Sequence, residues 1–173
     1  LDDERCRQLA VGAMYASQQG AWQNSLETGI VDVLPEILGD WWGIGSAEEA
    51  RGQLDYLCEK GFRCCWPTVL EAFNLDDRDR QDALLRRRMA TQEDYDKVTS
   101  QLENLRETFD ELMSCGVVAS QEELGRCGVT GWDAGRIVFL ARACCEMGYL
   151  SEEEAWRYTG RAGALAYVGW GAG

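Results

Sequence analysis

The residues best suited to chemistry lie in the last third of the chain, where charged and aromatic side chains form a short motif. The motif reads Trp132-Asp133-Ala134-Gly135-Arg136 and opens a segment with helical spacing of apolar residues. Asp133 and Arg136 are three positions apart, so they can pair on one helix surface. The Arg136 guanidinium can also lie over the Trp132 ring. The motif predicts either a structural pair at a helix start, which we favour, or an arginine that binds a carboxylate or phosphate in an apolar cleft.

A second group of residues steps along the final predicted helix by four, three and four positions. The group is Trp156, Gly160, Gly163 and Tyr167, and Trp170 continues the stripe. Glycine inside a helix costs about 1 kcal/mol relative to alanine, so two of them indicate that another backbone comes close. We expect a notch that holds either a neighbouring helix or, less commonly, a ligand. If the protein has a site, it should lie between this helix and the one that starts near Trp132.

A third candidate is the turn at residues 61–67, where Arg63 precedes Cys64 and Cys65. A neighbouring cation can lower a thiol pKa and make the cysteine reactive. The chain has no histidine, so neither a Cys-His dyad nor a Ser-His-Asp triad can be assembled. Carboxylate chemistry remains open, and no catalytic residue is assigned. The residues predicted to line a ligand or partner pocket are Arg63, Trp132, Asp133, Arg136, Arg142, Trp156, Gly160, Gly163 and Tyr167.

The cysteines show no pattern typical of a metal site. The eight are Cys6, Cys58, Cys64, Cys65, Cys115, Cys127, Cys144 and Cys145. None forms a C-x-x-C pair, and zinc would need four converging thiolates because no histidine can help. Most lie in apolar helical stripes, where a reduced thiol behaves as a small hydrophobic side chain. We therefore expect core cysteines without disulfides, and neither a metal nor a cofactor.

The charge of the chain restricts its partners. It carries 17 basic and 30 acidic residues, a net charge of −13. Such a surface repels phosphate backbones and anionic lipids, so we expect binding to neither nucleic acid nor membrane. No apolar run approaches the roughly 20 residues of a membrane span. A basic protein partner would suit the charge, although acidity also serves simple solubility. We expect a cytoplasmic protein.

The elements that would position these residues are helical almost throughout, so we predict an all-α fold in a single domain over residues 1–173. Helical spacing marks residues 2–19 and 30–42, and residues 21–29 form a loop with Trp22 folded back on the core. Three helix starts carry a capping box, in which a serine precedes a glutamate by three positions. The boxes are Ser46 with Glu49, Ser120 with Glu123 and Ser151 with Glu154. A weaker version pairs Thr91 with Asp94.

The longest predicted helix covers residues 92–115 and has the clearest amphipathic pattern. Its apolar stripe consists of Tyr95, Val98, Leu102, Leu105, Phe109 and Leu112. Steps of three and four place these side chains on one face. The stripe predicts packing within the domain, which we favour, or a homodimer seam through residues 95–112.

The same motifs carry a family resemblance. The matching pieces are Trp41-Trp42-Gly43-Ile44, Ala47-Glu48-Glu49-Ala50, residues 54–63, Trp132-Asp133-Ala134-Gly135-Arg136, Leu140-Ala141-Arg142, residues 148–156 and Trp170. On these pieces the chain resembles the bacterial family known as domain of unknown function 1266. That family usually has Gly-His-Arg where this chain has Gly61-Phe62-Arg63, so we expect no histidine-dependent role. Its pattern also tends to continue beyond the last tryptophan, which implies a chain shortened at its C-terminus. The resemblance implies a bacterial, mostly cytoplasmic helical protein and supplies no established activity.

Two functions follow from these observations. The first is a non-catalytic interaction module, immunity-like or chaperone-associated, that binds a protein with a basic surface. The alternative is a small-molecule-binding or hydrolytic enzyme, or a toxin domain, that uses the Asp/Arg/Trp pocket. With no catalytic set visible, we favour the first.

Overall fold

The computed structural model describes residues 1–170 of the chain, with side chains as far as Tyr167. The part described is all-α, as predicted, and contains no strand. The chain divides into two compact units: residues 1–62 with 129–173, and residues 63–128. The single-domain prediction is not tested by this division and stays a prediction. Within the described part, no helix combines the length and apolar character needed to cross a membrane.

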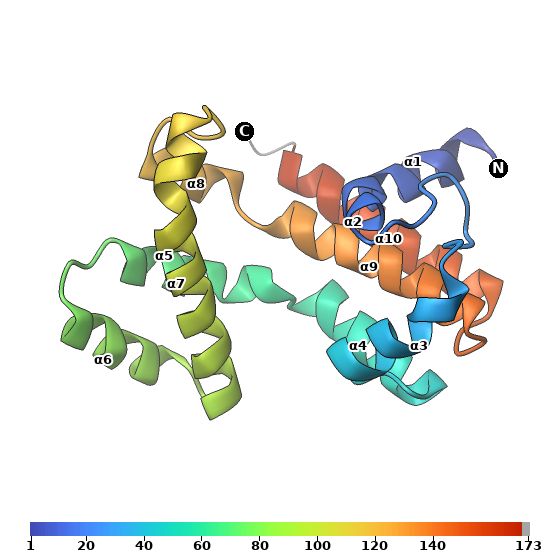
Figure 1. The fold of residues 1–173 in the computed structure, drawn as a ribbon, viewed down its shortest axis with the longest axis horizontal. Helices are drawn as coiled ribbons and strands as arrows, with labels where there is room; N and C mark the ends of the chain where they lie inside the picture. The colour runs from blue at the N-terminus through green and yellow to red at the C-terminus, as the bar shows by residue number, and fades with distance from the viewer. Residues whose placement is uncertain (171–173) are drawn as a thin grey trace. The chain divides into compact units, whose positions relative to one another are not determined.

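The first unit is built around two helices that lie side by side, α9 (Thr130–Glu146) and α10 (Glu152–Trp170) (Figure 1). Helix α9 forms the core because it is apolar on nearly every side, and Ile137, Val138 and Leu140 are fully buried. The other elements that pack on this pair come from the N-terminal third of the chain. They are α1 (Asp3–Val11), α2 (Ala13–Gln18), α4 (Ala47–Glu59) and the π turn η2 (Ile37–Trp41), which the short turns η1 (Val31–Val33) and α3 (Leu34–Glu36) precede.

The helix predicted over residues 2–19 is interrupted at Gly12, which separates α1 from α2. A Cβ atom at Gly12 would lie 2.6 Å from Cγ1 of Val138 in α9. Only glycine lets the backbone come this close, so tertiary packing decides where the helix breaks.

Residues 21–29 form a loop, as predicted, but the prediction that Trp22 folds back on the core was wrong. This side chain is 55% exposed and lies over Gly29 rather than in the core. The apolar helix predicted over residues 30–42 is not continuous, because residues 31–41 change from a 3₁₀ turn to a short α turn and then to a π turn.

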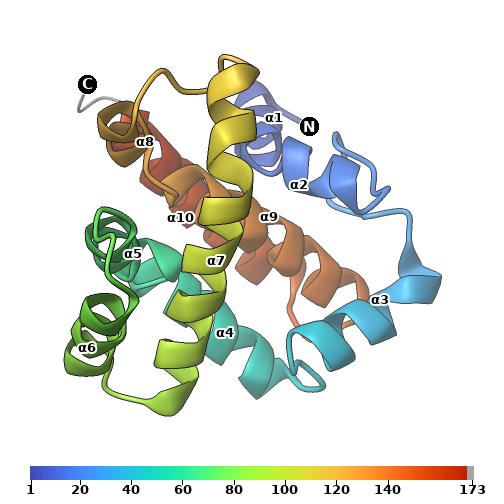
Figure 2. The ribbon, with the colours of Figure 1, turned by 60° about the vertical axis from the view of Figure 1, so that its left-hand side comes forward.

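The second unit begins within the 3₁₀ turn η3 (Phe62–Cys64), at Arg63. It then contains α5 (Trp66–Phe73), α6 (Arg78–Arg88), α7 (Gln92–Ser114) and α8 (Gln121–Cys127). Helix α7 confirms the predicted long helix. It packs on α5 and α6 (Figure 2), and its stripe residues Val98, Leu102 and Leu105 are buried. The stripe thus serves packing within this unit. The homodimer seam stays a prediction.

All four predicted serine and threonine caps are present. The amide of the third helical residue donates to Ser46 Oγ, Thr91 Oγ1, Ser120 Oγ and Ser151 Oγ at 3.1–3.2 Å. In a complete capping box, the carboxylate of the third helical residue also accepts a hydrogen bond from the backbone amide of the capping residue. This second bond joins the Ser151 amide nitrogen to Glu154 Oε2 at 2.9 Å. Glu49 and Glu123 instead accept the amide one residue earlier, at 2.9 and 2.6 Å.

The prediction that most cysteines lie in the core was wrong. Cys144 is buried, whereas Cys6, Cys64, Cys115 and Cys127 are exposed, and all eight are free thiols. Burial raises the pKa of the Cys144 thiol to about 12. Cys64, Cys115 and Cys127 lie in a turn or at helix ends, and Cys6 lies on an exposed side of α1, so helical spacing alone misassigned them.

Candidate functional site

Asp133 and Arg136 form the predicted pair on the first turns of α9. Asp133 is fully buried, pairs with Nη2 of Arg136 and also accepts the backbone N–H of Phe62 at 3.1 Å. The carboxylate therefore fixes the end of the chain segment that follows α4 as well as the arginine. This arrangement has the geometry of the structural alternative.

Aromatic rings surround the Arg136 guanidinium. Its central carbon lies 5.6 Å from the Trp42 ring and 6.0 Å from the Trp132 ring. The ring of Tyr15 meets the edge of Trp132 at 5.2 Å, and burial raises the Tyr15 pKa although Arg136 opposes the shift. The Arg136 side chain is 17% exposed. Among the described residues, its buried Nε finds no hydrogen-bond acceptor. We name this group of Tyr15, Trp42, Trp132 and Arg136 the arginine cage.

Arg142 lies on the same helix but binds the loop at residues 22–28 rather than Asp133. It is fully buried and donates from Nη2 to the carbonyl oxygens of Trp22 at 2.5 Å and Glu27 at 2.7 Å. Burial lowers its pKa, and the nearby Glu146 carboxylate opposes that shift. Glu146, one turn further along α9, accepts the backbone N–H of Thr28 at 2.8 Å. Arg142 and Glu146 thus hold both ends of the loop that precedes η1.

The two glycines of α10 face helix α1. A Cβ atom at Gly160 would lie 3.6 Å from Gln8 Nε2, and one at Gly163 would lie 3.9 Å from Gln8 Cγ. The neighbouring Thr159 hydroxyl donates to Gln8 Oε1 at 2.9 Å. Both glycines therefore contact only the Gln8 side chain, at ordinary van der Waals distance, and among the described residues no neighbouring backbone lies within 4 Å of either position. The expectation of a closely approaching backbone was wrong, and a ligand notch stays a prediction.

The remaining predicted residues have separate surroundings. Trp156 is 9% exposed and lies beneath the Arg5 guanidinium at 4.7 Å, and Tyr167 is 55% exposed. Arg63 is the first residue of the second unit. The side chain of Trp170 lies outside the described residues. Each residue thus has its own neighbours, and their role as a common pocket stays a prediction.

A cavity that the sequence did not reveal lies beside the loop held by Arg142. Its volume is 200 Å³, and it is lined by Leu26, Glu27, Cys145, Glu146 and Glu152. Three of these residues are glutamates, from the loop, the end of α9 and the start of α10, and no lining residue is basic. Burial, followed by the Glu152 and Glu146 charges, raises the Cys145 pKa. We name it the acidic cavity. In the described chain no group of histidine, cysteine, aspartate or glutamate has the arrangement needed to hold a metal ion.

Sequence reasoning missed this cavity because its carboxylates come from positions more than a hundred residues apart. The available signal was charge. Residues 8–50 contain six acidic residues and neither lysine nor arginine.

Comparisons with known proteins give one family. A family model described as "Protein of unknown function (DUF1266)" matches residues 37–171. No curated protein and no solved structure matches the chain. The matched range includes the acidic helix starts of α4 and α10 and the whole of the second unit.

Proposed function

We propose a function from charge and geometry, because the chain belongs to the DUF1266 family, whose description assigns no activity. The protein is a non-catalytic interaction module whose first unit binds a basic protein surface. The acidic cavity receives a lysine or arginine side chain of that partner. The single observation that carries the proposal is a 200 Å³ cavity whose lining includes Glu27, Glu146 and Glu152 and no basic residue.

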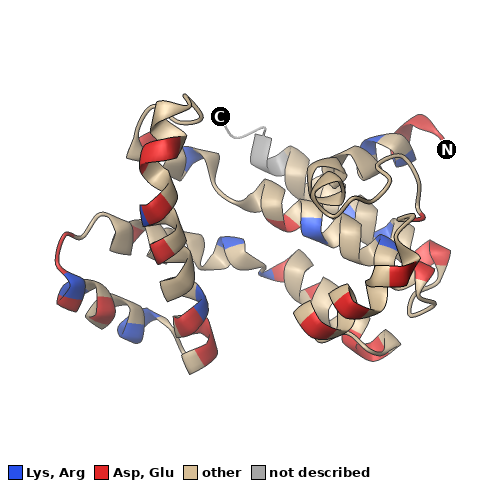
Figure 3. Cartoon of the chain, viewed as in Figure 1, with Lys and Arg blue, Asp and Glu red and all other residues tan. Residues whose placement is uncertain are grey.

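Other elements of the first unit also carry acidic residues. Acidic residues lie in α3, in η2 and in the first turns of α4 and α10 (Figure 3). Glu48, Glu152 and Glu153 in these first turns are exposed. Such a field raises the rate at which a basic partner is encountered and disfavours acidic partners.

Exposed apolar side chains in the same part of the sequence provide contact area. Val31, Val33 and Trp41 are 49%, 45% and 61% exposed. A large aromatic side chain next to carboxylates is typical of residues that dominate protein interfaces. The acidic groups would then select the partner, while Trp41 would contribute affinity.

The test compares two double variants that remove the same charge. Binding of a fluorescent lysine- and arginine-rich peptide is measured for Glu27→Gln/Glu152→Gln and for Glu111→Gln/Glu122→Gln in the second unit. We expect the first pair to weaken binding about tenfold, since each partly exposed ion pair contributes up to about 1 kcal/mol. The second pair, which leaves the acidic cavity intact, should change binding much less.

Two results would contradict the proposal. Equal weakening by both double variants would mean that the peptide responds only to net charge. Equal affinity for a glutamate-rich peptide of the same length would remove the role of the carboxylates altogether.

A second candidate function rests on the arginine cage. The Arg136 guanidinium retains 17% exposure and a buried Nε without an acceptor among the described residues. These features support the predicted alternative, a small-molecule site that binds a carboxylate or phosphate. Isothermal titration of the full chain with acetate and phosphate, repeated with Trp132→Ala, tests it.

A further inference from the structure

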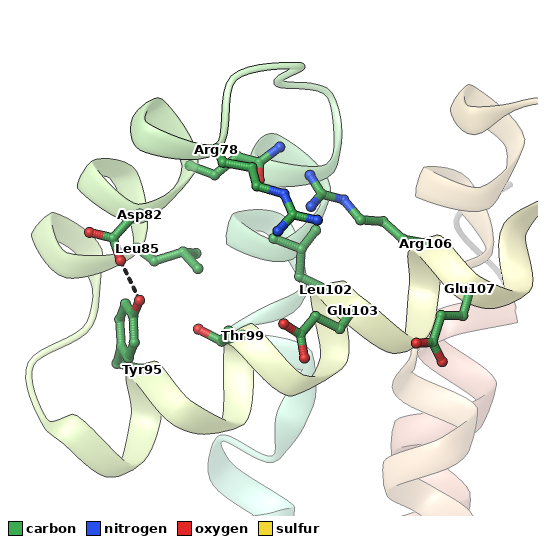
Figure 4. A pocket seen from close by; sticks show the side chains of 10 residues that line it. Arg78, Asp82, Leu85, Tyr95, Thr99, Leu102, Glu103, Arg106 and Glu107 are labelled. Carbon is green, nitrogen blue, oxygen red and sulfur yellow. Dashed lines mark hydrogen bonds between the residues drawn. The ribbon is translucent and has the colours of Figure 1, made fainter.

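A second cavity lies wholly within the second unit, between α6 and α7. Its volume is 330 Å³, which is within the range of small-molecule sites. The lining residues are Arg78, Gln81, Asp82, Leu85, Tyr95, Thr99, Leu102, Glu103, Arg106 and Glu107 (Figure 4). It shares no residue with the acidic cavity or with the arginine cage.

The floor of this cavity is apolar. Leu85 and Leu102 are 2% and 4% exposed and come from facing sides of α6 and α7. An apolar group resting on these two side chains would be removed from water.

Two arginines lie at the opening of this cavity. Figure 4 shows the guanidinium groups of Arg78, in the first turn of α6, and Arg106, in α7, pointing toward each other. Neither guanidinium group makes an ion pair or a hydrogen bond with another residue among those described. Two unpaired guanidinium groups that converge can bind one carboxylate between them, which also relieves their mutual repulsion.

The carboxylates of the same cavity differ in availability. Asp82 is already engaged, because it accepts from Arg86 Nε at 2.8 Å and from the Tyr95 hydroxyl. The hydrogen bond from the Tyr95 hydroxyl to Asp82 raises the Tyr95 pKa.

Glu103 makes no ion pair or side-chain hydrogen bond with another described residue. Glu107 also lines the cavity, and Figure 4 shows its carboxylate directed away from the two guanidinium groups. The buried Thr99 oxygen, one turn before Glu103, points toward the Tyr95 side of the cavity in Figure 4. It makes no hydrogen bond of normal geometry in the described chain, and its interaction with the Tyr95 hydroxyl acts to lower the pKa of that group, against the effect of Asp82.

We propose that this cavity binds a small zwitterion, an aliphatic α-amino acid. Arg78 and Arg106 bind its carboxylate, Glu103 and the Thr99 hydroxyl accept from its ammonium group, and its side chain rests on Leu85 and Leu102. Phosphate fits less well, because its second negative charge would lie beside Glu103. A simple amine fits less well, because it would approach two guanidinium groups without an anion to offset them.

The first experiment uses the unaltered full-length chain and four probes. Amide chemical shifts are followed during titration with L-leucine, 4-methylpentanoate, 3-methylbutylamine and inorganic phosphate. We expect saturable shifts in α6 and α7 with leucine, at a Kd of about 1 mM or below for a ligand of this size. The carboxylate analogue should bind about tenfold more weakly, and the amine and phosphate should give no saturable shift. Absence of a saturable leucine response, or binding of the amine or phosphate as tight as that of leucine, would overturn the proposal.

The second experiment assigns the residues with charge-matched controls. Arg78→Gln and Arg106→Gln should each weaken leucine binding about tenfold, and Glu103→Gln should reduce leucine to the level of 4-methylpentanoate. Arg87→Gln on α6 and Glu111→Gln on α7 are exposed positions outside the cavity and should leave binding unchanged. Leucine binding that survives both arginine changes would also refute the assignment. Circular dichroism of each variant shows that α6 and α7 remain folded.

Discussion

Asp133 is the residue whose removal should disturb the first unit most. It has no exposed surface, pairs with Arg136 on the same helix and joins α9 to the Phe62 amide. Asp133→Asn keeps the shape but leaves the Arg136 charge without its partner inside the arginine cage. Breaking a buried pair in this way costs about 3 kcal/mol.

Urea unfolding followed by tryptophan fluorescence measures this effect, since Trp42 and Trp132 belong to the cage. Asp32→Asn removes the same charge at an exposed position and should change the free energy of unfolding by less than about 0.5 kcal/mol. A loss at Asp133 no larger than at Asp32 would mean that the pair contributes little to stability.

Single residues also show the limits of sequence reasoning. The spacing of Asp133 and Arg136 revealed their pairing because both lie on one helix. Trp42 as the second ring over Arg136, and backbone carbonyls as the partners of Arg142, were not predictable in this way. These contacts join positions about 90 to 120 residues apart, and only tertiary packing brings them together.

Among the helices, Gly12 and Gly52 differ in whether a neighbouring element leaves room for a side chain. A Cβ at Gly12 would meet Val138 at 2.6 Å, whereas one at Gly52, in the middle of α4, would meet nothing within 4 Å. Gly12→Ala should therefore destabilise the protein by about 1–3 kcal/mol through overpacking. Gly52→Ala should stabilise it by about 1 kcal/mol, because alanine favours the helix. Thermal unfolding of both variants tests these two expectations, and a change in Tm of the same sign in both would contradict them.

The start of α10 should respond to acid. Glu154 accepts hydrogen bonds from Arg51 Nε and from Ser151, which lower its pKa from 4.5 to about 2. A carboxyl group whose pKa is lower in the folded state stabilises the fold above its unfolded pKa, and the contribution is lost as the pH falls toward the folded value. Glu154→Gln should therefore lower the Tm at pH 7, and the difference from the unaltered protein should shrink between pH 4.5 and 2. A Tm difference that stays constant over that window would refute the assignment.

Helix starts and the long stripe of α7 were predictable because they depend on neighbours three or four positions away. The Ser151 and Glu154 pair is one example, and Val98 with Leu102 is another. The break at Gly12 and the irregular turns over residues 31–41 were not, because they depend on what α9 and its neighbours leave room for. Arg78 and Arg106 likewise belong to different helices, so no local pattern marked the cavity between them.

At the scale of the whole molecule, the open question is whether its two units unfold as one domain. The second unit, residues 63–128, is inserted between the two parts of the first. A segment of this length buries a modest apolar core and is only marginally stable alone. We therefore expect it to unfold together with the first unit, in agreement with the single domain predicted from the sequence.

Tryptophan positions allow a direct measurement. Trp66 is the only tryptophan of the second unit in the sequence, so Trp66→Phe confines the fluorescence signal to the first unit. Circular dichroism still reports helices in both. Because a two-state transition gives the same midpoint by every probe, the two signals of this variant should change at one urea concentration. A helical transition that begins at lower urea than the fluorescence transition would show that the second unit unfolds by itself, and that the chain consists of two domains.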